Sequence, residues 1–224
     1  MKTTPPPAPP TTVTDIDPAT LVRRALLASA AELATALATV APSDRRRQKA
    51  LDRWFGGFAA QVRGHHELLD SIVVPALTNR GALDERALEQ VADDHSWIDE
   101  LLSELGDALG VLSFGLGAEA FWLGKAADLA AALHHVLDGQ LQREEALLSP
   151  LVGRFLDADE RDILHDETVR AVATGPVRFS LAWLYAHITV EEREAIDAYT
   201  SATGRLVGRT SRGAYERSAL AALG

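Results

Sequence analysis

The chain has 224 residues, of which 47% are hydrophobic, so it is long enough to bury the core of one large domain or of one domain with an appendage. Its formal net charge of −10 argues against nucleic-acid binding, which needs a clustered basic surface, and residues 45–47 are the one basic run. Because the chain contains no cysteine, disulfides, thiolate metal sites and cysteine nucleophiles are excluded.

The first 17 residues, which begin MKTTPPPAPPTTVT, are rich in proline and threonine. Such a composition cannot form a packed core, so we expect residues 1–17 to be an extended, disordered tail. The N-terminus has no charged region followed by an apolar block, and no stretch of the chain reaches about 18 consecutive apolar residues. We therefore expect a cytoplasmic protein that contacts neither a membrane nor nucleic acid.

Alanine, leucine, glutamate and arginine dominate the rest of the chain, and strand-like alternation is nearly absent, which predicts an all-α protein. Asp17 and Pro18 form an acidic cap followed by proline, a pattern that begins a helix. Four long helices are predicted, at about residues 18–41, 44–80, 84–109 and 118–156. Because their connections are short, we expect an up-down-up-down four-helix bundle over residues 18–156, with a glycine-rich loop at 110–117.

The predicted helix at 44–80 contains residues that destabilise a helix interior, namely Gly56, Gly57, Gly64 and Pro75. Each glycine costs about 1 kcal/mol relative to alanine, and the proline costs about 3 kcal/mol. A helix that tolerates them should gain something in return, such as close approach of a neighbour, a kink, or room for a ligand.

Residues 157–224 are expected to form a helical extension that packs on the bundle. The expected breaks between its shorter helices are at residues 174–176 and at the three glycines of 204–213. Residues 183–185, which read WLY, are the expected core anchors of this extension.

A short internal repeat relates the two halves of the predicted bundle. HHELLDSIVVPAL at 65–77 aligns with QLQREEALLSPLV at 140–152, and each has a proline ten residues after its first position. RRALLASAAEL at 23–33 likewise aligns with HSWIDELLSEL at 95–105. Because residues four apart share a helix face, the repeat predicts a duplicated hairpin with matching inward positions. These positions are Arg23, His65, Leu69, His95, Gln140 and Glu144.

Over about residues 18–156 the chain resembles the hemerythrin-like, or HHE cation-binding, family. The segments that carry the resemblance are HHE at 65–67 with the pattern that ends at Pro75, DDH at 93–95, and REEALLSPLV at 143–152. The remainder, with FSLAWLYAHITVEEREAI and RLVGRTSRGAYERSAL, is similar to the C-terminal extension of actinobacterial members. The resemblance implies a four-helix bundle in which histidines and glutamates hold two iron ions.

The ligand set that the resemblance implies is incomplete in this chain. The family uses a histidine on the first helix, a histidine and a glutamate four residues later on the second, a histidine on the third, and another such pair on the fourth. Carried over by position, these ligands fall on Arg23, His65, Leu69, His95, Gln140 and Glu144. Three of these six side chains are not ordinary metal ligands, and the permanent charge of Arg23 would repel a dication.

A shift by one residue gives a second ligand arrangement, because His66 and Asp70 are also four apart. The shift requires a rotation of about 100° around the helix, which a local bulge at Gly64 would absorb. Together with His95 and Glu144, this pair would form a reduced site of two histidines and two carboxylates that suits one Fe, Mn or Zn ion.

Three functions are compatible with these altered positions. In the first, which we favour, the protein has no metal cofactor, and its central pocket binds an organic small molecule, either without converting it or with conversion by cofactor-independent acid–base chemistry. In the second, rearranged ligands bind iron, and the protein handles O2, peroxide or nitric oxide, or senses iron. In the third, an Arg23–Glu144 ion pair closes the core of a structural or regulatory protein.

The favoured hypothesis assigns residues to two groups. The candidate acid–base residues are His65, His66, Asp70, His95 and Glu144. The expected pocket residues are Arg23, Leu69, Gln140 and an apolar wall of Trp54, Phe58 and Trp97.

The other histidines are expected to lie outside the site. His134 and His135 do not share a helix face with Gln140, so an edge or surface position is expected for both. His165 is expected on an exposed helix, and His187 just before a helix that Thr189 caps.

Overall fold

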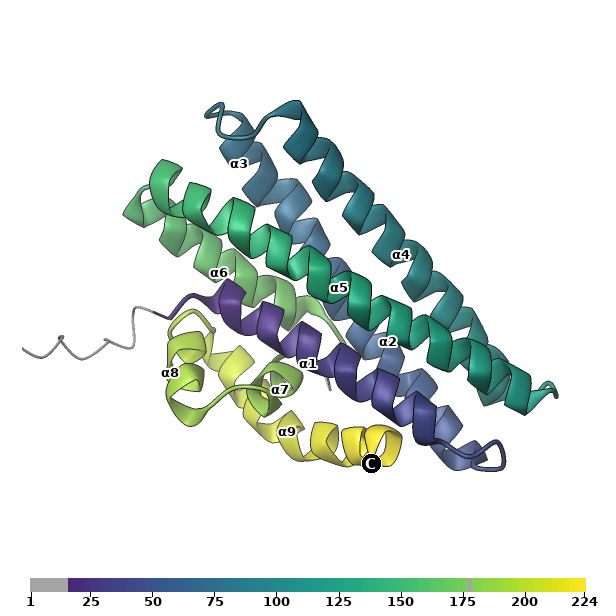
Figure 1. Ribbon diagram of the computed structural model, residues 1–224. Helices are drawn as coiled ribbons and strands as arrows, with labels where there is room; N and C mark the ends of the chain where they lie inside the picture. Colours follow the sequence, from purple (N-terminus) through teal and green to yellow (C-terminus); the bar gives the residue numbers. More distant parts are fainter. Residues whose placement is uncertain (1–15, 177–178) are drawn as a thin grey trace, which may run out of the picture.

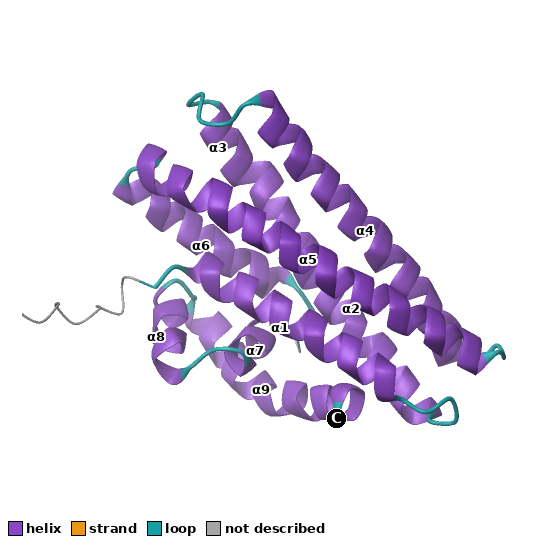
Figure 2. Cartoon of the chain, viewed as in Figure 1, coloured by secondary structure: helices purple, strands orange, loops and turns teal. Residues whose placement is uncertain are grey.

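The computed structural model describes residues 16–176 and 179–224, and every regular element in these residues is a helix (Figure 1; Figure 2). The all-α prediction is therefore confirmed, whereas all but the last two residues of the predicted tail lie outside the described residues. The long helices are α1 (Pro18–Thr39), α2 (Arg45–Leu68), α4 (Glu85–Phe114) and α5 (Glu119–Phe155).

These long helices pack as antiparallel neighbours. Helix α1 packs against α5, α5 against α4, and α4 against α2. The turns that join α1 to α2 and α4 to α5 lie at one end of the molecule, and the connections from α3 (Val74–Thr78) to α4 and from α5 to α6 (Ala158–Thr174) lie at the other (Figure 1). The arrangement is that of a bundle of long helices, as the short connections predict.

Local capping signals set where α1, α2 and α4 begin. The Asp17 carboxylate accepts a hydrogen bond from the Ala19 amide at 3.0 Å, and Pro18 occupies the first turn, as predicted. Asp44 and Asp84 cap α2 and α4 in the same way. Each carboxylate satisfies an amide that has no partner within its helix.

The helix predicted at 44–80 is interrupted, and this part of the prediction is wrong. Helix α2 is followed by a π-helical turn, η2 (Leu69–Val73), and then by the short α3 (Val74–Thr78). Pro75 has no amide hydrogen to donate, and the Val74 amide before it donates to the carbonyl of the residue five positions back. The widened turn comes after the two histidines rather than at Gly64, so it repositions Asp70 and leaves the histidines in regular helix.

The loop predicted at 110–117 is also shorter than expected. Helix α4 continues to Phe114 and ends at Gly115, whose φ of 69° lies in the left-handed region that favours glycine. Of the glycines in the predicted loop, Gly115 is therefore the one that marks the end of the helix.

The C-terminal extension consists of α6 (Ala158–Thr174), α7 (Ser180–Ala186), α8 (Val190–Ala198) and α9 (Ala202–Leu223), which pack on α1 and α2. Capping boxes begin α6 and α8, and Thr189 caps α8 as predicted. The breaks expected at 204–213 are wrong, because all three glycines lie inside α9. At Gly208 an added Cβ would lie 2.7 Å from the Tyr185 ring, so the glycine allows α9 to approach α7 closely.

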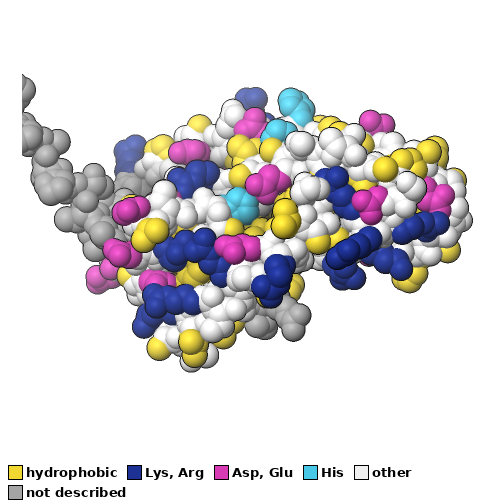
Figure 3. Space-filling model, turned by 90° about the horizontal axis from the view of Figure 1, so that it is seen from below, with side chains coloured by type: hydrophobic (Ala, Val, Ile, Leu, Met, Phe, Trp, Pro, Cys, Tyr) yellow, Lys and Arg dark blue, Asp and Glu magenta, His cyan; other side chains and the backbone are white. Residues whose placement is uncertain are grey.

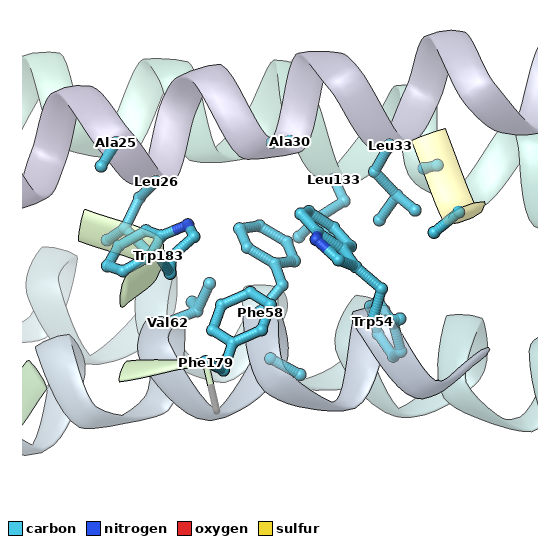
Figure 4. Close-up of a cluster of buried hydrophobic side chains, with 14 of the residues drawn as sticks. Ala25, Leu26, Ala30, Leu33, Trp54, Phe58, Val62, Leu133, Phe179 and Trp183 are labelled. Atoms are coloured by element: carbon cyan, nitrogen blue, oxygen red, sulfur yellow. The ribbon is translucent and has the colours of Figure 1, made fainter. Parts of the chain in front are cut away.

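The bundle and the extension share one hydrophobic core. Trp54 and Phe58 of α2 lie with Phe179 and Trp183 of the extension in this core (Figure 4). The ring centroids of Trp54 and Phe179 are 5.6 Å apart, and an added Cβ at Gly57 would lie 2.3 Å from the Phe179 ring. The core positions expected for residues 183–185 are confirmed, since all three are buried.

The surface carries charged side chains of both signs. On the face that Figure 3 shows, lysine and arginine side chains lie among aspartate and glutamate side chains. None of the helices in the described part of the chain is long and apolar enough to span a membrane.

Candidate functional site

A cluster of polar side chains lies buried where α2, α4 and α5 meet. It contains histidines from two helices and an amide and a carboxylate from the third. Its members are His65, His66, His95, Gln140 and Glu144, and none is more than 6% exposed. Buried polar groups need partners, so the contacts within this cluster decide what it can do.

The Glu144 carboxylate is the centre of the cluster. It accepts hydrogen bonds from His65 Nε2 at 2.8 Å and from the Gln140 side-chain amide, and it faces His95 Nε2 at 3.8 Å. Burial alone would raise the pKa of Glu144, but the charge and hydrogen bond of His65, with a further contribution from the other histidines, outweigh burial and lower this pKa. Glu144 is therefore an anion at neutral pH.

His66 contacts His95 and Gln140 within the cluster. Its ring stacks on that of His95 with centroids 4.0 Å apart, and its Nε2 lies 3.0 Å from the Gln140 amide nitrogen. Burial, together with the neighbouring histidines, lowers the pKa of His66 to about 3, so this ring is neutral at physiological pH. Its Nδ1 is buried and has no hydrogen-bond partner among the described residues.

Asp70 contacts His95 and not His66. Its carboxylate, on a side chain that is 57% exposed, lies 3.0 Å from His95 Nδ1. Burial lowers the pKa of His95, but the contacts with Glu144 and Asp70 outweigh burial and raise it. The expected His66–Asp70 pair is thus wrong, because Asp70 lies in the η2 turn and reaches across to α4.

The arrangement of these donors can be tested against the metal sites expected from the sequence. Asp70 and Glu144 face opposite ring nitrogens of His95, so an ion bound at either nitrogen could not take both carboxylates. Among the described residues, no group of three or more histidine, aspartate or glutamate side chains is arranged to hold a metal ion. The geometry therefore gives no support to one ion held by both Asp70 and Glu144 at His95, and the alternative of iron binding stays a prediction.

A cavity of about 200 Å³ lies next to the His65–Glu144 pair, between α1, the end of α2 with η2, α5 and α6. Its polar lining includes Arg23 as well as His65 and Glu144. The apolar part of its lining is mainly aliphatic and is formed by Leu68, Leu69, Val73, Leu148, Val152 and Leu164. The cavity therefore combines an acid–base pair with an apolar interior.

Arg23 lies in this cavity without pairing with Glu144. Its side chain is 11% exposed, its guanidinium donates to the Thr20 hydroxyl at 3.0 Å, and the nearest carboxylate oxygen, on Asp17, is 3.8 Å away. The Arg23 Nε atom is buried without a hydrogen-bond partner among the described residues. The ion pair expected between Arg23 and Glu144 is wrong, because Glu144 is bonded to His65 instead.

The aromatic wall expected for the pocket is also wrong. Trp97 is 55% exposed on the surface of α4. Trp54 and Phe58 are fully buried in the shared core and do not line the cavity (Figure 4). Aliphatic residues, among them Leu69, take the place of these rings.

Helix α6 contributes cavity residues that the sequence reasoning missed. Arg161, His165 and Thr168 line the cavity, and His165 is half-buried with its Nδ1 3.2 Å from the Tyr199 hydroxyl. Together with Leu164, these residues are spaced three and four apart and form one stripe of α6. That spacing indicates a buried helix face, but it lies in the segment that the sequence predicts to be an appendage outside the site.

The α4–α5 side of the cluster carries an ion pair that was not expected either. The Arg143 guanidinium donates two hydrogen bonds to the buried Asp94 carboxylate, at 2.7 and 2.9 Å.

His134 is half-buried and His135 is exposed, as expected for edge positions. His187 follows α7, and its Nδ1 lies 2.9 Å from the Trp183 carbonyl oxygen.

No family model, curated protein or solved structure matches the chain. The function therefore has to be inferred from the chemistry of the cluster and the cavity.

Proposed function

We propose that this protein is a hemerythrin-like bundle in which the metal-ligand positions have been replaced and the cavity binds an organic small molecule. The observation that carries the proposal is the cavity of about 200 Å³ beside the buried, hydrogen-bonded His65–Glu144 pair. The convergence of the repeat's matched positions supports the family assignment: His65, His95 and Glu144 meet in one cluster, and Arg23 shares the cavity with two of them.

The His65–Glu144 pair is suited to proton transfer. Because ionised Glu144 only accepts hydrogen bonds, His65 donates from Nε2, and the lone pair of a neutral His65 is then on Nδ1. A histidine held in one tautomer by a carboxylate is a common general base. We propose that His65 exchanges a proton with the bound molecule and that Glu144 fixes the imidazole.

The size of the cavity limits the ligand. Drug-sized ligands occupy pockets of roughly 300–1,000 Å³, so a cavity of about 200 Å³ takes a smaller molecule. The aliphatic walls favour a molecule with an apolar body, which burial removes from water.

Iron chemistry is supported less well than small-molecule binding. Arg23, Leu69 and Gln140 occupy three positions that the family fills with ligands, and Asp70 is separated from Glu144 by the His95 ring. Metal analysis of protein expressed with added iron tests this alternative, because stoichiometric iron would contradict the proposal.

Two glycines of α5 offer a matched test of the cavity as the binding site. Gly153 lines the cavity and Gly124 does not, and an added Cβ would meet no atom within 4 Å at either position. In a screen of small organic compounds by protein-observed NMR, we expect ligands that bind the wild type and Gly124→Phe but not Gly153→Phe. Equal binding to both variants, or no ligand at all, would contradict the proposal.

Catalysis is tested separately from binding. For a compound that binds, His65→Gln should retain binding but abolish any conversion or solvent-proton exchange of the ligand. Undiminished conversion by this variant would remove His65 from the acid–base role.

A further inference from the structure

We infer that the ligand of this cavity is an organic carboxylate with an apolar body and that the Arg23 guanidinium anchors its charged end; this inference rests on the proposed small-molecule site. It adds the chemical class of the ligand and assigns a binding role to a residue that does not take part in the His65–Glu144 pair.

Arg23 has hydrogen-bond donors that the described residues leave unused. A guanidinium carries five N–H donors, and the described residues supply Arg23 with one close acceptor, the Thr20 hydroxyl at 3.0 Å. Asp17 does not neutralise it at close range: the separation is 3.8 Å, and the Asp17 oxygens accept from the Ala19 amide and the Thr20 hydroxyl at 3.0 Å. A largely buried cation with free donors is costly unless an anion pairs with it.

The charged side chains around the cavity leave its two arginines able to pair with a ligand anion. Arg23 and Arg161 are its two permanent cations, and Asp17 and Glu144 are its two carboxylates. Glu144 is bonded to His65 and Gln140. Arg161 donates to the Leu156 carbonyl and forms no ion pair within the described part of the chain. The acids are therefore engaged, whereas both guanidiniums can still bind an anion.

The Arg23 guanidinium and the aliphatic part of the lining together match an organic acid. A guanidinium presents a planar fork that matches a carboxylate with two parallel hydrogen bonds. Six larger aliphatic side chains, including Leu148 and Leu164, form the apolar part of the lining, and they would cover an apolar body. An inorganic anion would leave this aliphatic surface uncovered, so the lining favours an organic acid.

The test compares three probes by isothermal titration calorimetry on the full chain: benzoate, benzamide as its neutral analogue, and inorganic phosphate. We expect benzoate to bind at least about tenfold more tightly than benzamide, which corresponds to one charge-assisted hydrogen bond, and we expect no binding of phosphate. Arg23→Met should abolish the preference for benzoate. Arg24→Met is the matched control, because the exposed neighbouring arginine pairs with Glu192 and does not line the cavity.

Each other result overturns a defined part of the inference. An equal affinity of the wild type for benzoate and benzamide would refute the anionic ligand but keep the small-molecule site, whereas no binding of either would remove both. Phosphate binding as tight as that of benzoate would refute the apolar body. An unchanged preference in Arg23→Met would refute the role of Arg23. If that variant does not fold, Arg23→Lys decides, because a lysine lacks the fork and should lower the benzoate-to-benzamide ratio; an unchanged ratio would refute the guanidinium as anchor.

Discussion

Replacement of Glu144 by glutamine isolates the charge at the centre of the cluster. The amide keeps the shape of the side chain but loses the charge that holds His65 at 2.8 Å and faces His95 at 3.8 Å. A hydrogen bond to a charged group contributes about 1.5–3 kcal/mol, and the lower cost of burying an amide offsets part of that loss. We therefore expect Glu144→Gln to lower the free energy of unfolding by about 2 kcal/mol, which for a chain of this length lowers the melting temperature by roughly 4–8 °C.

The assay is urea unfolding followed by circular dichroism, with Glu145→Gln as the matched control, because Glu145 is the exposed neighbour on the same helix. The effect should also depend on pH with a definite sign. The pKa of Glu144 is lowered in the folded protein, so its contribution is present above the unfolded pKa and is lost as the pH falls through the folded pKa. Glu144→Gln and the wild type should therefore converge in strong acid. Equal stabilities of Glu144→Gln and Glu145→Gln at neutral pH would refute the central role of this carboxylate.

Three further predictions concern the same cluster, the shared core and the cavity. Burial lowers the folded-state pKa of His66 to about 3, so between about pH 6.5 and 3 the unfolded chain binds the extra proton, and acidification should destabilise the protein by up to about 1.4 kcal/mol per pH unit. Urea unfolding across this range should show that the free energy of unfolding of His66→Gln falls less steeply with falling pH than that of the wild type, and an identical pH dependence would contradict the lowered pKa. Gly57→Ala should lower the melting temperature by overpacking against Phe179, at a cost of about 1–3 kcal/mol, whereas Gly56→Ala, whose added Cβ meets no atom within 4 Å, should raise stability by about 1 kcal/mol. A change of melting temperature in the same direction for both variants would contradict the packing of the extension against α2. Arg23→Met should leave the ligand-free protein equally or more stable, by roughly 0–2 kcal/mol in urea unfolding, because a buried guanidinium with an unsatisfied Nε is removed; a large loss of stability would indicate a structural role for Arg23 instead.

Helix starts could be predicted because their causes are local. The Asp17 cap and the Thr189 cap each depend on a carboxylate or hydroxyl next to its own helix, and both form as expected. Helix interruptions depend on packing and were predicted less well. Gly208 reads as a breaker, yet it lies inside α9 because the absence of a Cβ lets the Tyr185 ring approach. The π turn before Pro75 likewise could not be located from the sequence.

The buried positions of the site could be predicted from the repeat, because a spacing of four residues fixes a shared helix face. His65, His95 and Glu144 are buried and meet, as that spacing indicates. The choice of partner could not be predicted, because it depends on the rotation of each helix about its axis. Glu144 therefore bonds His65 and not Arg23. The cavity also includes α6, whose residue spacing indicates which face is buried but not where the helix packs on the bundle.

The most direct test of this account is a crystal structure of protein expressed with added iron and then soaked with benzoate. We expect benzoate in the cavity, with its carboxylate on Arg23 and its ring beside His65 and Leu148. A metal ion held by His65, His95 and Glu144, or a benzoate-free cavity closed by its own side chains, would contradict the account.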